Sequence, residues 1–423
     1  MTEATQPTLA EASRVWWKIG ILSFGGPAAQ IALMHSIIVD EKRWLPDKQF
    51  LNALSFCMLL PGPEAMQIAT YSGWRLHGTI GGLIAGGLFV IPGAIVLLAL
   101  AALYANFGNV PLVEALFLGV KACVIAIVVE ALIRISKKAL GTTLSHTLAV
   151  LSFIAIFALG IPYPLIVLAA ALVGYFAASG GRPHDATPVA LKPAKTMQTA
   201  LIWLALWLLP LTALYLATDG GLLAQIGLFF SKLAIVTFGG AYAVLAYMAQ
   251  DVVDKLGWLE PQEMVDGLGL AETTPGPLIL VTEFVGFLAA EKAGGFWLGV
   301  AAACVTLWTT FIPCFAWIFT GAPYVDWISD QPRLKGALSG ITAAVVGVIA
   351  NLSLWFAIHV FFREVGELGS GPISLVWPDW ETLDWRVVVL AILSAILLLR
   401  LHWNIMLVLM ISAFGGLLIS RFF

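Results

Sequence analysis

Charged side chains are scarce in this chain. Lys and Arg number 22 and Asp and Glu 25, which together make 11% of the 423 residues. Soluble domains carry about 25% charged residues. Apolar residues make up 60%. A soluble protein of this length could not cover its surface with so few charges, so a water-soluble enzyme is excluded. At about 20 apolar residues per transmembrane helix, the composition allows on the order of 12 spans.

Several chemical signatures are missing as well. The four cysteines, Cys57, Cys123, Cys304 and Cys314, lack CxxC or Cys/His spacing, so we expect neither a metal site nor a disulfide framework. The sequence has no phosphate-binding loop and no paired histidines, so we expect no nucleotide, no cofactor and no catalysis. The net charge of −3 gives no electrostatic reason to bind nucleic acid.

Long apolar runs are present instead, and four hydrophobic segments are interrupted. These segments are residues 13–39, 50–76, 221–253 and 264–290. Their interruptions are Gly25-Gly26-Pro27, Pro61-Gly62-Pro63, Gly239-Gly240 and Pro275-Gly276-Pro277. Proline and paired glycines end helices, and the freed backbone groups need partners at membrane depth. Two polar stretches, 179–196 and 363–385, are predicted to form a cytoplasmic linker and an exposed loop.

The interruptions repeat along the chain. Three motifs, Phe24-Gly25-Gly26, Trp44-Leu45 and Pro61-Gly62-Pro63, recur 214 residues later as Phe238-Gly239-Gly240, Trp258-Leu259 and Pro275-Gly276-Pro277. Ile91-Pro92 recurs 221 residues later as Ile312-Pro313. This register indicates a duplication whose second copy carries one short insertion.

We therefore predict an all-α polytopic membrane protein with discontinuous helices. Its parts would be a first repeat (1–178), a linker with a connecting span (179–219) and a second repeat (220–423). Counting each broken segment as one span gives about 13 spans and an odd number of crossings between equivalent points of the copies. That count predicts inverted repeats, a recurring transporter plan, with the N-terminus in the cytoplasm. The basic residues agree only in part, and Pro-Gly-Pro segments that dip in and return would make the copies parallel.

The ordered, duplicated motifs resemble the chromate transporter family, in its long-chain form with two repeats. The first copy supplies Phe24-Gly25-Gly26-Pro27, Val39-Asp40, Trp44 and Pro61-Gly62-Pro63. The second supplies Phe238-Gly239-Gly240-Ala241, Val253-Asp254, Trp258 and Pro275-Gly276-Pro277. Ala241 stands where the first copy has Pro27, so the two halves need not bind equally. The resemblance covers nearly all of the chain and implies export of chromate, a sulfate-like dianion.

The breaks themselves suit an anion. A helix that begins just after Gly26, Gly62, Gly240 or Gly276 has free backbone N–H groups and a positive dipole end. Glycine lets an oxyanion approach the backbone closely, and proline at the first helical position loses no hydrogen bond. We predict that these ends surround a tetrahedral dianion, together with Gly25, Pro63, Gly239 and Pro277. The alternative is that they are ordinary kinks in packed helices.

Two lysines stand at equivalent positions, six residues before each Phe-Gly-Gly. Lys18 and Lys232 would each cost about 2.5–3.5 kcal/mol at the centre of a membrane helix, which a bound anion would offset. The alternative is that they reach out to the membrane interface. Ser23 and Thr237 are hydroxyl donors beside the glycines, unless they bond back to their own helices.

Lys121 is a one-sided candidate for the anion site. It lies near the middle of the apolar run 112–133, and its counterpart 221 residues later is Thr342. The alternative is a structural ion pair with Glu114, Glu130 or another helix.

Three carboxylates near the breaks are candidates for proton coupling. Glu64 follows the first Pro-Gly-Pro, where helix capping is the alternative, and Glu272 and Glu283 flank the second. Asp40, Trp44, Asp254 and Trp258 form matching pairs, for which we expect interfacial caps or gates. Gln30 and His35, after the first break, are expected in structural rather than ligand roles.

The leading interpretation is a secondary oxyanion transporter of the cytoplasmic (inner) membrane, conferring chromate resistance by efflux. Membrane potential or a proton gradient would drive it, because potential alone favours export of a dianion from a negative interior. The partners would be chromate or a sulfate-like oxyanion and the lipid bilayer, and a homodimer is left open. The alternatives are transport of sulfate or another anion, and a passive anion channel.

Overall fold

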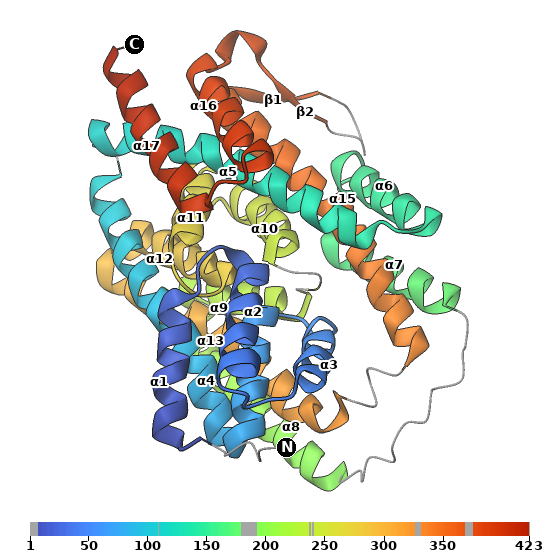
Figure 1. Cartoon of the computed structure of the whole chain (residues 1–423). Helices are drawn as coiled ribbons and strands as arrows, with labels where there is room; N and C mark the ends of the chain where they lie inside the picture. The colour runs from blue at the N-terminus through green and yellow to red at the C-terminus, as the bar shows by residue number, and fades with distance from the viewer. Residues whose placement is uncertain are drawn as a thin grey trace. The chain divides into compact units, whose positions relative to one another are not determined.

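The computed structural model describes residues 7–108, 110–178, 193–236, 238, 241–325, 331–368 and 375–422. Helices dominate these residues (Figure 1). The helices long and apolar enough to cross a membrane are Glu64–Phe107, Pro111–Ala139, Ala194–Thr218, Phe296–Tyr324, Pro332–Phe361 and Ile405–Phe422. Shorter apolar helices are Thr143–Phe157, Tyr163–Ala177 and Leu222–Val236. The predicted fold class, an all-α polytopic membrane protein, is confirmed.

The chain divides into two compact units, each of which takes segments from both halves of the sequence. Unit 1 comprises Met1–Ala101, Gly180–Ala241 and Thr274–Leu334, and unit 2 comprises Ala102–Ser179, Tyr242–Thr273 and Lys335–Phe423. This division follows packing and is distinct from the predicted division into repeats. Most of the linker 179–196 lies outside the described residues.

Unit 1 contains the helices on both sides of the two breaks of the first repeat, together with α9 and α12 from the second repeat. Its elements are α1 (Leu9–Leu22), α2 (Gly26–His35), η1 (Ser36–Glu41), α3 (Asp47–Cys57), most of α4 (Glu64–Phe107), α8 (Pro193–Thr218), α9 (Leu222–Val236), η3 (Leu278–Leu280), α12 (Val281–Gly294), α13 (Phe296–Gly321) and η4 (Ala322–Tyr324).

Two glycine turns produce helical hairpins in unit 1, one within α4 and one between α12 and α13. Within α4, His77 and Gly78 leave the helical conformation, and Gly78 has a φ of 62°. A methyl group built on Gly73 would lie 2.3 Å from the carbonyl oxygen of Gly81, so the two arms of α4 pack backbone against backbone. Gly295, with a φ of 82°, makes the equivalent turn between α12 and α13. Both repeats therefore contain a helical hairpin after the Pro-Gly-Pro motif.

The first arm of each hairpin is too short to cross a membrane alone. The arm α12 has 14 residues, about 21 Å of helix, whereas the hydrocarbon core is about 30 Å thick. Its residues from Val281 to Ala290 are all buried, as are those from Ala65 to Gly73 of α4. Broken helices at membrane depth are tolerated where protein surrounds them, and these two arms meet that condition.

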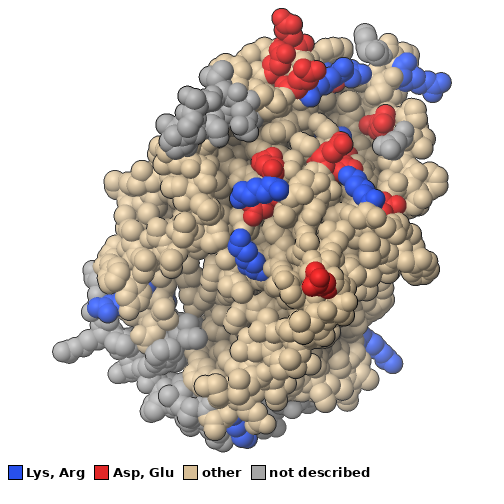
Figure 2. All heavy atoms as spheres, turned by 180° about the vertical axis from the view of Figure 1, so that it is seen from behind, with Lys and Arg blue, Asp and Glu red and all other residues tan. Residues whose placement is uncertain are grey.

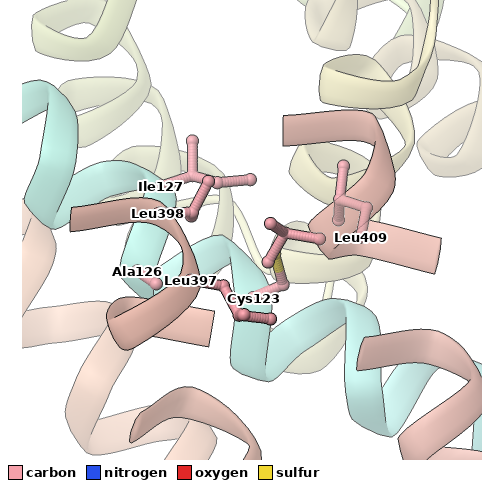
Figure 3. Close-up of a cluster of buried hydrophobic side chains, with 7 residues drawn as sticks. Cys123, Ala126, Ile127, Leu397, Leu398 and Leu409 are labelled. Atoms are coloured by element: carbon pink, nitrogen blue, oxygen red, sulfur yellow. The ribbon is translucent and has the colours of Figure 1, made fainter. Parts of the chain in front are cut away.

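Unit 2 is built around α5. It contains α5 (Pro111–Ala139), α6 (Thr143–Phe157), α7 (Tyr163–Ala177), α10 (Ala241–Gln250), η2 (Asp251–Lys255), α11 (Pro261–Thr273), α15 (Pro332–Phe361), η5 (Trp380–Thr382), α16 (Trp385–Ala395), η6 (Ile396–Arg400) and α17 (Ile405–Phe422). Cys123 and Ile127 of α5 form an apolar cluster with Leu398 and Leu409 (Figure 3). Helices α5 and α17 approach each other closely at Gly119, which has no side chain. A methyl group at this position would lie 1.7 Å from the Ser412 carbonyl oxygen, so a larger residue would not fit.

The repeated Trp motif has a structural cause. In both copies a π-helical segment, η1 or η2, is followed two residues after its end by a residue with positive φ, Arg43 or Gly257. The tryptophan that follows closes the turn, since Trp44 N–H donates to Ile38 O (2.8 Å) and Trp258 N–H to Val252 O (3.0 Å). The same turn recurs after η6, where Trp403 N–H donates to Leu397 O (3.1 Å), an instance that the sequence analysis missed.

The surface has the character expected for a bilayer environment. Large apolar side chains such as Ile80, Ile95, Leu209, Leu216 and Phe414 are exposed. Figure 2 shows one face, on which the charged side chains are few and several of them lie in small groups of both signs. The exposed apolar side chains would face lipid rather than water.

The described parts of the stretch 363–385 form regular structure where an exposed loop was predicted. Strands β1 (Val365–Leu368) and β2 (Leu375–Pro378) pair antiparallel with Val365 opposite Pro378. Asp384 then begins α16, where its carboxylate accepts from the backbone N–H of Arg386 (3.1 Å) and from the guanidinium Nε (2.9 Å) and Nη2 (2.7 Å). The Arg386 guanidinium holds the pKa of Asp384 below its ordinary value, and Arg363 adds to the effect.

We expect Asp384→Asn to lower the free energy of unfolding by about 1–2 kcal/mol near neutral pH, because charge-assisted hydrogen bonds to Arg386 are lost. The parent's advantage is present above the ordinary aspartate pKa and is lost as pH falls through the lowered folded-state value. Thermal unfolding in detergent at neutral and acidic pH measures it. Asp379→Asn, at an exposed cap of η5, is the matched control. An equal loss at both pH values would contradict the assignment.

Candidate functional site

The first repeat breaks where the sequence predicts. Helix α1 ends at Leu22 and α2 begins at Gly26, with Gly25 and Gly26 at φ values of 84° and 80°. Helix α3 ends at Cys57 and α4 begins at Glu64, with Gly62 at a φ of 117°. Other residues rarely adopt such values, so the backbone itself requires glycine here.

The second repeat has matching breaks. Helix α9 ends at Val236 and α10 begins at Ala241, while Thr237, Gly239 and Gly240 lie outside the described residues. Helix α11 ends at Thr273, and Gly276 has a φ of 88°. Pro277 then begins the turn that leads through η3 into α12. The discontinuous helices expected at both Pro-Gly-Pro motifs are therefore present.

One set of hydrogen bonds joins the first break of repeat 1 to the Pro-Gly-Pro break of repeat 2. Gly276 N–H donates to Ser23 O (2.8 Å). The Gln30 side-chain amide donates to Gly276 O (2.7 Å) and to Ser23 O (3.3 Å), and this residue is only 2% exposed. In this conformation the Gly276 N–H is therefore committed to a carbonyl oxygen, and Gln30 acts as the bridge between the breaks.

Close packing surrounds both Pro-Gly-Pro turns. A methyl group on Gly62 would lie 2.7 Å from Cys314 Sγ and 2.9 Å from Gln67 Nε2, which itself donates to Pro61 O at 2.7 Å. A methyl group on Gly93 of α4 would lie 2.1 Å from Pro275 O, so α4 packs directly on the second turn. A larger residue at any of these glycines must displace its neighbours.

A small cavity lies beside the first Pro-Gly-Pro turn. It is lined by Gly62, Pro63, Phe230, Leu233, Ala234, Ile279 and Thr310. Its accessible volume is about 10 Å³, which is room for about one water molecule. Among the described residues the buried Thr310 hydroxyl has no hydrogen-bond partner. The cavity is too small for a tetrahedral oxyanion, so this conformation is closed beside the first Pro-Gly-Pro turn.

The candidate ligands Lys18, Lys232 and Ser23 do not line that cavity in this conformation. Lys18 on α1 and Lys232 on α9 are both exposed, at equivalent positions of their helices. Ser23 is fully buried, and its hydroxyl donates back to Ile19 O (2.6 Å), as in the alternative considered for it. What Ser23 contributes at the break is its backbone carbonyl.

The three coupling candidates are distributed over both units. Glu283 on α12 in unit 1 is 1% exposed, and among the described residues its Oε2 has no hydrogen-bond partner. Glu64, the first residue of α4, is half-buried. Glu272 on α11 in unit 2 is 4% exposed and accepts a hydrogen bond from Tyr242 OH (2.8 Å).

Lys121 belongs to unit 2, where it is paired. Its Nζ lies 3.3 Å from Oδ2 of Asp266 on α11, and Tyr104 OH donates to the same oxygen at 2.8 Å. The ion pair expected as the alternative for Lys121 is present, with a partner that sequence reasoning missed. The available signal was an aspartate inside the apolar stretch 264–271.

The predicted gate residues occupy the π-helical turns. Asp40 and Asp254 are exposed, whereas Trp44 is buried and Trp258 half-buried. His35 Nε2 lies 2.7 Å from Asp47, and His35 Nδ1 lies 3.4 Å from Asp40, which links the end of α2 to α3. Within the described ranges, no group of three His, Cys, Asp or Glu side chains is arranged to hold a metal ion.

The fold and the breaks define a class: a polytopic helical membrane protein built from two copies of a broken-helix unit. Within that class, the chain belongs to the chromate transporter family, whose model matches residues 10–175 and 224–417. The two matched regions correspond to the two copies of the motif set.

Curated relatives agree over most of the chain. The chromate transport protein of Cupriavidus metallidurans is 30% identical over 87% of this chain and 86% of its own length. The chromate transport protein of Pseudomonas aeruginosa is 31% identical over 88% and 86%. The uncharacterized transporter YwrA of Bacillus subtilis is 31% identical over 88% of its own length but only 36% of this chain. No solved structure matches the chain.

We expect Gly62→Val and Gly276→Val to lower transport strongly while the protein still inserts into the membrane. A side chain at these φ values stores about 1–3 kcal/mol of strain, which corresponds to roughly 5- to 150-fold in the population of the native turn. Initial rates of oxyanion flux, normalised to inserted protein, measure the loss. Gly160→Val is the matched control, because Gly160 also has positive φ (58°) but open space around it. Parental flux in both break variants would contradict a role for the turns.

Proposed function

We propose that the protein is a secondary transporter that exports chromate across the cytoplasmic membrane. Membership of the chromate transporter family and the names of the relatives support the substrate. The observation that carries the proposal is the hydrogen-bonded link between breaks of the two repeats, Gly276 N–H to Ser23 O with Gln30 across it. Breaks that pair in one conformation can separate in another.

The link suggests how the anion would be bound. The Gly276 N–H and the Gln30 amide are donors that carbonyl oxygens occupy in the closed conformation. When the breaks separate, the same donors and the N-terminal end of α2 would face the anion. An oxyanion accepts hydrogen bonds as carbonyls do, with the added attraction of its charge for the helix dipole. Binding would therefore exchange one set of acceptors for another.

Membrane potential or a proton gradient would supply the energy. With a negative interior, export of a dianion releases about 2.3 kcal/mol per charge per 100 mV. Glu64, Glu272 and Glu283 stay predicted proton carriers, and flux of their Gln variants against a pH gradient tests each. The geometry favours Glu283 within unit 1, because it is a buried carboxyl group.

The arrangement in the membrane is also part of the proposal. The N-terminus would lie in the cytoplasm, and the repeats 1–178 and 220–423 would be inverted about the segment 179–219. The glycine turns at Gly78 and Gly295, which give both copies the same hairpin, support a shared repeat architecture. Labelling of single cysteines placed in each inter-helix loop, read on intact cells, tests the sidedness.

Lys18 and Lys232 would act through the electrostatic potential near the breaks. Because both side chains are exposed, we expect Lys18→Gln and Lys232→Gln to raise the half-saturating chromate concentration only by roughly two- to fivefold each. Concentration-dependent flux gives this value. Lys195→Gln on α8 in the same unit is the control for loss of an exposed charge. If neither variant differs from that control, the lysines have no part in anion binding.

The decisive experiment is chromate flux in vesicles that contain the purified protein, with voltage and pH gradients set separately. A transporter should give saturable flux that responds to the imposed potential, and protein-free vesicles supply the background. Sulfate competition shows whether the site accepts another tetrahedral dianion. Flux that keeps rising without saturation would indicate a channel, and chromate flux equal to the background would contradict the proposal.

A further inference from the structure

Unit 2 contains a largely buried polar cluster, Lys121, Asp266 and Tyr104, to which the proposed function assigns no role. Lys121 lies near the middle of the long apolar helix α5, and its side chain is 19% exposed. Asp266, on α11, has a side chain that is only 5% exposed. Tyr104, at the end of α4, completes the cluster. An intramembrane charge is costly and commonly marks a pathway for ions or substrate.

The hydrogen bonding of Asp266 is one-sided. Its Oδ2 faces both Lys121 Nζ (3.3 Å) and Tyr104 OH (2.8 Å). Its Oδ1 is buried and has no hydrogen-bond partner among the described residues. A buried carboxylate held only for packing would be expected to have both oxygens satisfied. The vacant oxygen is a position where the carboxylate could accept a proton.

The cluster has no charged equivalent in the duplicated sequence. By the register of the repeats, the counterparts of Lys121, Asp266 and Tyr104 are Thr342, Asn52 and Val325. The breaks are duplicated but this ion pair is not. A feature of the shared repeat architecture would be expected in both copies. The ion pair therefore has a role that is present once in the protein and is not duplicated with the repeats.

We propose that Lys121 is a second oxyanion subsite and that Asp266 is an internal anion that occupies it when substrate is absent. This inference rests on the proposed oxyanion transport. The dianion and the Asp266 carboxylate compete for the same ammonium group, since an ionised Asp266 beside Lys121 would repel the incoming charge. The more exposed partner, Lys121, is the one that the substrate can reach.

Release of Lys121 requires Asp266 to become neutral. A hydronium ion transfers its proton to the Asp266 carboxylate and leaves as water, so binding of one anion takes up one proton. The groups that face Asp266 are Lys121 from α5, Tyr104 from α4 and Glu263 from α11 itself. Glu263 adds negative charge, whereas Lys121 and Tyr104 stabilise the ionised carboxylate. Anion binding at this subsite should therefore strengthen as the pH falls.

The test is calorimetric binding of chromate to the full-length protein in detergent, above neutral pH where chromate stays a dianion. Titrations in buffers of different ionisation enthalpy give the number of protons taken up. We expect the parent to take up about one proton for each chromate bound. Its affinity for chromate should fall by up to about tenfold for each unit by which the pH rises. Asp266→Asn should bind more tightly than the parent, with no proton uptake at this subsite and no pH slope.

Two further variants make the result specific. Lys121→Met should remove the pH-dependent binding component. Asp251→Asn is the matched control, because Asp251 is also a buried carboxylate bonded to a lysine, but this lysine, Lys255, has a side chain that is 64% exposed. It should bind as the parent does. Should Asp266→Asn fail to fold, Tyr104→Phe replaces it, and the pH of half-maximal binding should move upward because the ionised carboxylate loses a donor.

The outcomes separate this inference from the proposed function. If the parent carries chromate in vesicles but Asp266→Asn keeps the pH slope or binds more weakly, the ion pair is structural and the inference is overturned. Loss of the slope in Glu272→Gln, with the slope intact in Asp266→Asn, would overturn it equally. If the parent neither binds nor carries chromate, the proposed function itself fails.

Discussion

Hydrogen bonding of the backbone at the helix breaks is the constraint on which unit 1 depends. A polypeptide that leaves the helical conformation at membrane depth exposes N–H and C=O groups that lipid cannot satisfy. Here two of the described breaks satisfy each other: Gly276 N–H donates to Ser23 O, and the Gln30 amide donates to the carbonyl oxygens of both residues. The two repeats are thus joined in unit 1 through the same backbone groups that we propose for binding the oxyanion.

The packing around the breaks follows from that constraint. The arms after the Pro-Gly-Pro turns must be enclosed by protein, and glycines allow the enclosing helices to come close enough. Gly93 packs on the Pro275 carbonyl, and Gly20 of α1 packs on the Leu88 carbonyl of α4. Such contacts leave little free volume, which explains why the cavity beside Gly62 holds no more than about one water molecule. Opening a path for an oxyanion therefore requires movement of whole helices rather than of side chains.

The sequence predicted features set by local chemistry and missed those set by distant partners. Glycine and proline act on their own backbone, so the breaks at Gly25-Gly26, Pro61-Gly62-Pro63 and Pro275-Gly276-Pro277 could be located directly. The role of Gln30 depends on Gly276, which is 246 residues away, and no spacing rule reveals such a partner. The same holds for Asp266, whose meaning depends on Lys121 in the other half of the sequence. The turn after η6 was missed because it lacks the Val-Asp pair that precedes the other two.

Duplication and asymmetry are combined in a way that fits transport of a charged substrate. The repeated elements of the interior are backbone features, the glycine turns, hairpins and π-helical ends, which bring dipoles and N–H groups but no net charge. The repeated charges, Lys18 with Lys232 and Asp40 with Asp254, are exposed. The titratable groups Lys121, Asp266, Glu272 and Glu283 differ between the copies. Backbone dipoles can bind an oxyanion equally well at every pH, whereas only side chains that change protonation can couple binding to protons. A symmetric backbone with single-copy buried charges therefore allows the proposed recognition of the anion and its energetic coupling to be carried by separate sets of groups.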